Sequence, residues 1–293
     1  MWKGLFHLKT KGGCKVLTDN LTAKISLILI CSIGWSFSKS DENPTILLPQ
    51  EKIEFPLKKE WLEKRYTKRD TKTKVKLFFI VHNLGFNAST TAKILKILPK
   101  NIAISLTPYV KQSKDTLKII KQKGHHVLWV QPMELYRQPN TVSDPYRLSR
   151  YKDKQHNIES VTNTLSDMPG STVGVIADET SPVLRDEETL LTLLLELKKR
   201  KLTLLSPEMS VNSEFMNLCH THGVKCDEAD YSISRTDTAS NVVSLLNRVK
   251  ELGEQTGYAI CVIDAHWPYV VTLLEWCSRL DKKQFELYPY SMD

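Results

Sequence analysis

The sequence lacks an uninterrupted apolar run of the length that an ordinary membrane-spanning helix needs, which is about 20 residues. Residues 25–37, ISLILICSIGWSF, carry no charge but are shorter than that. Their length is typical of the apolar core of an export signal or a signal anchor. Lysines precede the stretch and Asp41 and Glu42 follow it, which predicts a cytoplasmic amino terminus. The alternative is a buried helix of a soluble domain.

The chain also lacks any known nucleic-acid-binding motif, although its formal net charge is +8. Much of the positive charge lies in two stretches, residues 1–24 and 58–76. Basic stretches of this kind contact phosphate or anionic lipid, or serve as solvated tethers. We favour solvated tethers, because neither stretch is interleaved with stacking aromatics, and we expect no nucleic-acid partner. A contact with the membrane is expected through the amino-terminal segment that holds the uncharged stretch.

The six cysteines are too dispersed to form a disulfide framework. The stretch CHTHGVKC, residues 219–226, holds two cysteines and two histidines, but it lacks the CxxC or HxxxH spacing of closed zinc sites. We therefore expect no metal there. Cys219 and Cys226 can pair as a local disulfide if the domain is exported, and the sequence leaves open whether they do.

Four parts are expected along the chain. After the amino-terminal basic and apolar segments, prolines and charged residues without clean periodicity predict a linker that leads to the folded part. The parts are a basic segment (1–24), a signal or anchor (25–38), a linker (39–74) and a folded domain (75–293). The protein is accordingly expected to be membrane-anchored or exported to the extracytoplasmic, periplasmic side. The sequence does not tell whether the leader is cleaved.

Strand-like and helix-like runs alternate from residue 75 to the carboxyl terminus. Close strand–helix alternation requires crossover connections and therefore predicts a mainly parallel sheet. The number of units fits a (β/α) barrel better than two open sheets. The expected strands are residues 75–81, 101–107, 125–131, 172–178, 202–208, 258–264 and 284–290, with a weak one within 225–233.

Several motifs in this region occur together in one known family. They include FIVHNLGFNASTTAKIL, AISLTPY, GHHVLWVQPMEL and YAICVIDAHWPYVVTLLEW, in this order. From about Val75 onward the chain resembles the divergent polysaccharide deacetylase family, a branch of the glycoside hydrolase/deacetylase β/α-barrel superfamily. The resemblance implies an α/β fold with a distorted (β/α)7-type barrel. It also implies deacetylation of a carbohydrate by a bound divalent metal, usually zinc, which activates water and polarises the acetyl carbonyl.

The family pattern places an Asp–Asp pair after the first strand and histidines after the fourth and last strands of the motif set. This sequence has His82 and Asn83 at the first place, where the family tends to read IDDLG. It has Asp178 and Glu179 at the second place. The last place, where the family has a GHPH-like strand end, reads IDAHWP and holds Asp264 and His266.

Two interpretations of these departures remain. In the first, His82, Asp178 and His266 bind zinc or another divalent metal, and Asp264 or Glu179 is the catalytic base. In the second, catalysis is lost and the barrel binds a cell-envelope glycan or a protein partner. We favour loss, because three simultaneous departures would need coordinated compensation.

Four further residues are candidates for binding an acetylated amino sugar or another glycan. Tyr109 and Trp267 offer aromatic faces that suit pyranose rings. Asn83 and Glu134 lie at strand ends, where they can face the mouth of a barrel. For Glu134, a structural salt bridge is an equally strong interpretation.

Overall fold

The computed structural model describes residues 73–109, 114–135, 144–178, 181–207 and 214–291. All of them belong to the second of the chain's two units, Glu54–Asp293. The expected basic segment, the signal or anchor and most of the expected linker therefore lie outside the described residues. None of the described helices is long and apolar enough to cross a membrane.

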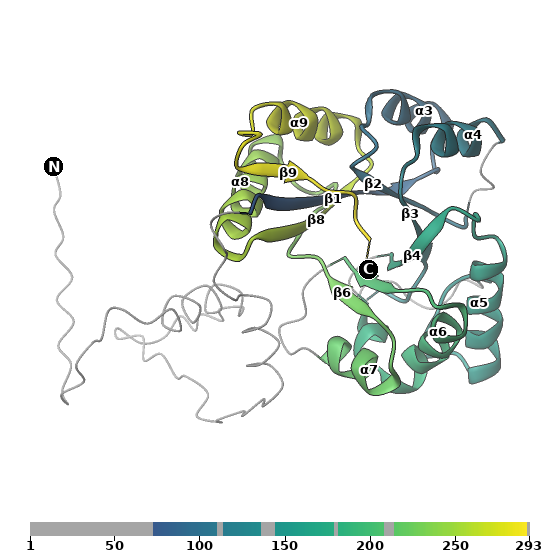
Figure 1. Ribbon diagram of the computed structural model, residues 1–293. Helices are drawn as coiled ribbons and strands as arrows, with labels where there is room; N and C mark the ends of the chain where they lie inside the picture. Colours follow the sequence, from purple (N-terminus) through teal and green to yellow (C-terminus); the bar gives the residue numbers. More distant parts are fainter. Residues whose placement is uncertain (1–72, 110–113, 136–143, 179–180, 208–213, 292–293) are drawn as a thin grey trace, which may run out of the picture. The chain divides into compact units, whose positions relative to one another are not determined.

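A curled parallel sheet forms the centre of this unit (Figure 1). Its nine strands are β1 (Val75–Leu84), β2 (Ala103–Leu106), β3 (Val127–Gln131), β4 (Thr172–Ala177), β5 (Leu204–Ser206), β6 (Cys226–Glu228), β7 (Tyr231–Ile233), β8 (Tyr258–Asp264) and β9 (Phe285–Leu287). Their order is β6-β5-β4-β3-β2-β1-β8-β7, and β9 pairs with the start of β1. All these pairs are parallel, which confirms the expected distorted (β/α) barrel.

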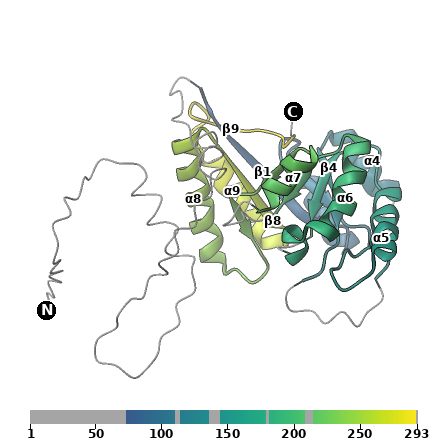
Figure 2. The same cartoon turned by 90° about the horizontal axis from the view of Figure 1, so that it is seen from below.

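Helices cover the outer side of the sheet, with α8 and α9 on one flank and α4 to α7 on the other (Figure 2). The helices are α3 (Ala88–Ile97), α4 (Lys114–Lys123), α5 (Lys154–Ser166), the 3-10 turn η1 (Pro182–Arg185), α6 (Glu187–Arg200), α7 (Glu214–His222), α8 (Ala239–Thr256) and α9 (Trp267–Ser278). Each lies between two strands, as right-handed β/α connections require.

The expected weak strand within 225–233 is in fact two strands at opposite edges of the sheet. β6 pairs with β5, whereas β7 pairs with β8. Between them the N–H of Ala229 donates to Ser206 and the N–H of Asp230 donates to Ile260. These two residues therefore bridge both edges of the curled sheet, which is why a single continuous strand cannot form here.

The side-chain alternation of β1 determines which residues face the barrel interior. Leu77 and Phe79 pack outward in the core beneath the helices, whereas Ile80 belongs to a separate interior cluster. Successive side chains of a strand point to opposite faces. His82, two residues after Ile80, therefore points into the barrel at the carboxyl end of β1.

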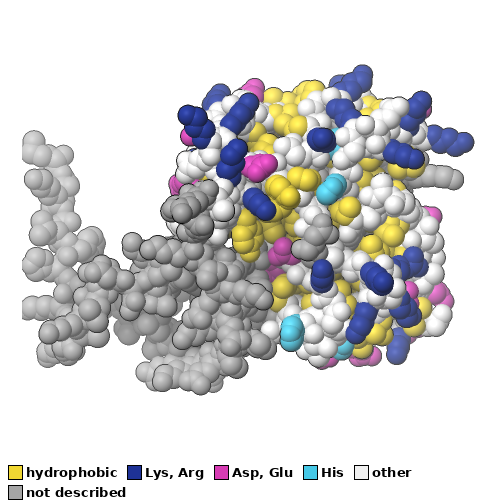
Figure 3. Space-filling view, viewed as in Figure 1, with side chains coloured by type: hydrophobic (Ala, Val, Ile, Leu, Met, Phe, Trp, Pro, Cys, Tyr) yellow, Lys and Arg dark blue, Asp and Glu magenta, His cyan; other side chains and the backbone are white. Residues whose placement is uncertain are grey.

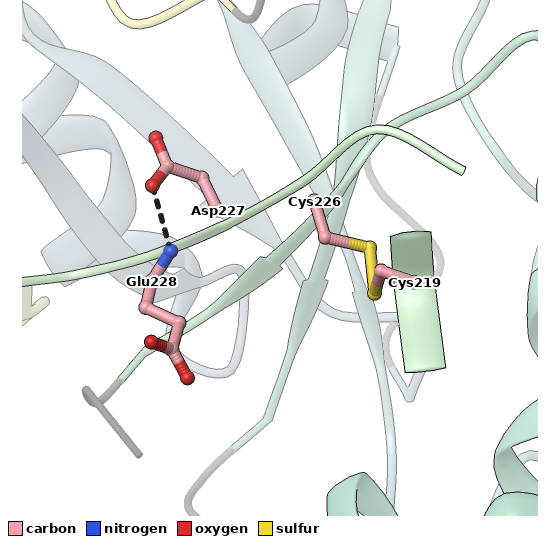
Figure 4. The surroundings of a disulfide bond; sticks show 4 residues. All are labelled: Cys219, Cys226, Asp227 and Glu228. Carbon is pink, nitrogen blue, oxygen red and sulfur yellow. Dashed lines mark hydrogen bonds between the residues drawn. A yellow bond between two sulfur atoms is a disulfide. The ribbon is translucent and has the colours of Figure 1, made fainter. Parts of the chain in front are cut away.

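A disulfide joins Cys219 in the last turn of α7 to Cys226 at the start of β6 (Figure 4). The sequence left this pairing open, and the structure shows it. The described part of the chain also holds two free cysteines, Cys261 and Cys277, which form no disulfide. Burial raises the pKa of both thiols, that of Cys277 to about 12, so both stay protonated and unreactive at neutral pH.

Replacing Cys219 and Cys226 together by serine is expected to lower the free energy of unfolding by roughly 2–3 kcal/mol, since the bridge closes a short loop in the unfolded chain. Denaturant titration measures the change, with Cys277→Ser as the matched single-thiol control. Reductant should destabilise the wild type to the same extent. Equal midpoints for wild type and double variant would contradict this expectation.

His125, just before β3, makes stability depend on pH. It is 4% exposed and its Nδ1–H donates to the carbonyl of Ile102 at 3.1 Å. Burial, aided by the charge of Lys123, lowers the pKa of His125. As the pH falls below about 6.5, the unfolded chain takes up a proton that the folded protein does not, so stability falls.

His125→Asn should flatten this pH dependence, because the asparagine amide can donate to Ile102 but does not titrate. The measurement is the free energy of unfolding between about pH 7 and about pH 5. His220→Asn, at an exposed position of α7, is the control and should keep the wild-type slope. The same slope in His125→Asn and wild type would refute the assignment.

Candidate functional site

His82 lies at the carboxyl end of β1 with both ring nitrogens engaged inside the protein. It is 3% exposed. Its Nε2 lies 2.6 Å from the backbone carbonyl of Asp178, and its Nδ1 lies 2.7 Å from Oγ of Ser105. A carbonyl can only accept, so Nε2 carries the proton and Nδ1 accepts from the serine hydroxyl. Neither nitrogen is left free to bind a metal in this arrangement.

Asn83 continues this hydrogen-bonded set. Its backbone has φ 62°, and the pairing of β1 with β2 is irregular between Val81 and Leu84. Asparagine tolerates this left-handed conformation better than most residues. The N–H of Asn83 donates to Oγ of Ser105 at 2.9 Å, and Nδ2 donates to Oδ1 of Asp178 at 3.3 Å. The irregularity thus turns Asn83 toward Ser105 and Asp178, which joins the ends of β1, β2 and β4.

Asp264 and His266 make other contacts, Asp264 with the segment between β7 and α8 and His266 with α9. Asp264 pairs with His82 in the strand register, but its Oδ2 accepts from the backbone N–H of Arg235 at 3.1 Å. The exposed ring of His266 packs edge-on against Tyr269, with centroids 4.6 Å apart. Of the three predicted metal ligands, the structure therefore brings His82 and Asp178 together and leaves His266 on the rim.

The residues described do not fit the zinc ion that the family resemblance implies. No three His, Cys, Asp or Glu side chains within the described ranges are grouped so that they could hold a metal ion. The nitrogens of His82 are hydrogen-bonded, and the neutral amide of Asn83 brings no charge to a cation. Glu179, the other candidate base, lies outside the described residues.

Glu134 is an anchor for the segment that follows β3. It is 3% exposed, and its carboxylate accepts from the hydroxyl of Ser149 at 3.1 Å and from the backbone N–H of Arg150 at 2.9 Å. The guanidinium of Arg150 forms an ion pair with it at 2.9 Å. Because protein donors surround both carboxylate oxygens, this geometry matches the structural interpretation of Glu134.

Three aromatic rings form a ladder at the carboxyl end of the sheet. Phe86 follows β1, Tyr109 follows β2 and Tyr146 lies in the segment after β3. Phe86 and Tyr109 are stacked with centroids 6.2 Å apart, and Tyr109 meets Tyr146 edge-on at 5.9 Å. Phe86 is 50% and Tyr109 36% exposed, so both rings of the stacked pair are accessible from solvent.

Asp144 fixes the orientation of Tyr109. The tyrosine hydroxyl donates to Oδ2 of Asp144 at 2.6 Å, and Arg147 forms an ion pair with the same oxygen at 3.2 Å. Burial of the hydroxyl, with the hydrogen bond and charge of Asp144, raises the pKa of Tyr109. The hydroxyl therefore stays protonated and keeps donating well above neutral pH. Trp267, the other predicted aromatic, is 39% exposed at the start of α9.

Sequence reasoning missed Ser105, Phe86 and Tyr146. Ser105 had a visible signal, because it is a polar residue in the otherwise apolar strand AISL. Phe86 and Tyr146 follow strand ends within turns, in NLGF and DPY, where aromatic residues are not needed for strand packing. Their meeting depends on the relative positions of three segments, which no local pattern contains.

The sequence profile of the divergent polysaccharide deacetylases matches residues 79–292. No curated protein matches the chain closely enough to count as a relative. Among solved structures, an uncharacterised protein from Agrobacterium tumefaciens C58 superimposes with a TM-score of 0.68 at 17% identity, over 77% of this chain and 92% of its own. A family 4 carbohydrate esterase from Bacillus anthracis gives a TM-score of 0.40 at 14% identity, over 80% and 89%. At such identities, the first of these likenesses supports the fold alone.

Proposed function

The chain belongs to the divergent polysaccharide deacetylase family, and from that premise we propose that it is a carbohydrate-binding member with weak or no deacetylase activity. The observation that carries the proposal is the hydrogen bonding of His82. Its Nε2–H donates to the carbonyl of Asp178, and its Nδ1 accepts from the hydroxyl of Ser105. The place where the family has its first acids is thus filled by a set of protein hydrogen bonds.

The proposed ligand is an acetylated amino-sugar chain of the cell envelope, bound on the aromatic ladder. Open ring faces suit the apolar faces of pyranose rings. The guanidinium of Arg147, held beside the ladder by Asp144, offers donors to sugar hydroxyls, and polar groups of this kind fix ligand orientation in binding sites.

The proposed location is the extracytoplasmic side of the membrane. The disulfide between Cys219 and Cys226 supports it, because disulfides persist in oxidising compartments. The uncharged stretch at residues 25–37 supports it as well, through its likeness to an export signal or anchor.

The competing function is an active enzyme that uses His82, Asp178 and His266 as metal ligands, and zinc analysis separates the two. After incubation with zinc and dialysis, we expect the purified protein to retain far less than one equivalent. Asp178→Ala and the control Asp153→Ala, at the exposed start of α5, should then behave alike. One equivalent of zinc that is lost only in Asp178→Ala would sink the proposal.

A further inference from the structure

The amino ends of the strands gather at one end of the barrel, because all strands run parallel. Apart from the cap residue Lys201, the turns that enter the strands there carry five exposed lysines, two of them before β9 and one each before β1, β2 and β6. These are Lys74, Lys100, Lys225, Lys282 and Lys283, named here the amino-end lysines. No ion pair joins them to another residue in the described ranges. The turns before β4 and β9 hold one acid each, Asp167 and Asp281, and Asp227 of β6 lines a pocket together with Lys74.

The helix dipole does not account for these lysines. Helix carboxyl ends lie at this end of the barrel and favour cations in their last turns, which explains Lys96 and Lys121. The effect fades beyond the last turn. The amino-end lysines lie outside the helices and their cap residues, so the dipole gives no local reason for them.

Neighbouring lysines at this end already have partners inside the protein. The ammonium of Lys76 lies 4.5 Å from the ring centre of Tyr288. Lys123 donates to the carbonyl of Lys96 at 2.7 Å and thereby caps α3. The amino-end lysines differ from these two because their side chains are exposed to solvent. On the face that Figure 3 shows, Lys and Arg side chains are widely spread and Asp and Glu are sparse.

We propose that the amino end of the barrel binds the anionic headgroup surface of a phospholipid membrane. The amino-end lysines come from four separate turns, so they form a broad array, although Lys74 also lines a pocket at this end of the barrel. Such an array suits a flat charged surface, where each lysine near the headgroups adds to the attraction. This proposal goes beyond carbohydrate binding and does not depend on it.

The position of the aromatic ladder favours a membrane over another polyanion. The aromatic ladder lies at the opposite, carboxyl end of the strands. A barrel bound through its amino end would therefore present the ladder away from the membrane, toward a glycan.

The test compares two variants of the full chain that lose the same charge. In the first, the five amino-end lysines become glutamine. In the second, five lysines elsewhere become glutamine: Lys93, Lys114, Lys118, Lys152 and Lys154. Co-sedimentation is measured with phosphatidylcholine vesicles with and without phosphatidylglycerol, and the readout is the gain in affinity that phosphatidylglycerol gives. Because the gain is a difference between the two kinds of vesicle, binding through apolar residues that does not depend on lipid charge cancels out.

We expect the gain to fall about tenfold or more in the first variant and much less in the second, since only the first removes charge from the contact surface. An equal fall in both variants would show that net charge alone acts, and would overturn the proposal. No fall in the first variant would overturn it as well. Tighter binding of soluble polyglucuronate than of vesicles, lost in the first variant, would replace the membrane by an anionic glycan.

Discussion

Tyr109→Ala is expected to weaken the binding of acetylated amino-sugar oligomers by about tenfold or more, which corresponds to about 1.4 kcal/mol. Tyr109 is the middle ring of the aromatic ladder, stacked on Phe86 and in edge contact with Tyr146. Its removal takes away a partly exposed ring and the ring contacts of both neighbours. Isothermal titration of the full chain with oligomers of increasing length measures the loss.

Two controls make this result specific. Tyr151→Ala removes a tyrosine that is 70% exposed and outside the aromatic ladder, so binding should be unchanged. Tyr109→Phe keeps the ring but loses the hydrogen bond to Asp144, so the loss should be smaller than for alanine. Wild-type affinity in Tyr109→Ala would show that the sugar does not bind on this face.

Glu134→Ala is expected to lower the free energy of unfolding by about 3 kcal/mol. The substitution leaves the buried hydroxyl of Ser149 and the backbone N–H of Arg150 without their acceptor, and such groups cost about 1–3 kcal/mol each. The guanidinium of Arg150 is partly exposed, so its loss of an ion pair adds little. Thermal or denaturant unfolding measures the change.

The control for Glu134 is Glu196→Ala, which removes a half-buried acid that pairs with Lys199 on α6 and should cost less than about 1 kcal/mol. The two interpretations of Glu134 predict different readouts. A structural anchor lowers stability, whereas a substrate ligand would lower sugar affinity and leave stability intact. The second pattern would contradict the role that the structure gives to Glu134.

The sheet was predictable because its strands are buried on both sides and read as apolar runs separated by helix periodicity. The run YAICVID was expected as a strand over 258–264, and β8 has these bounds. The stretch 225–233 could not be assigned in the same way. Its two strands are short, and their partners, β5 and β8, are fixed by the closure of the curled sheet rather than by local sequence.

The site was predictable only as a location. Strand order placed His82 and Asp178 at the same end of the barrel, and the structure brings them into contact. The irregular pairing at Asn83 and the hydroxyl of Ser105 determine which hydrogen bonds the ring nitrogens of His82 make. Neither feature can be predicted from the spacing of residues in the sequence. His266 was expected beside them, but its ring packs on Tyr269 instead.

The central claim is that this barrel binds a carbohydrate and has weak or no deacetylase activity. The most direct test measures acetate release by the full chain from acetylated amino-sugar oligomers that it is shown to bind, with zinc or cobalt added. We predict saturable binding and no acetate release above the rate without protein. Metal-dependent release that disappears in Asp178→Ala would contradict the claim and establish an active enzyme.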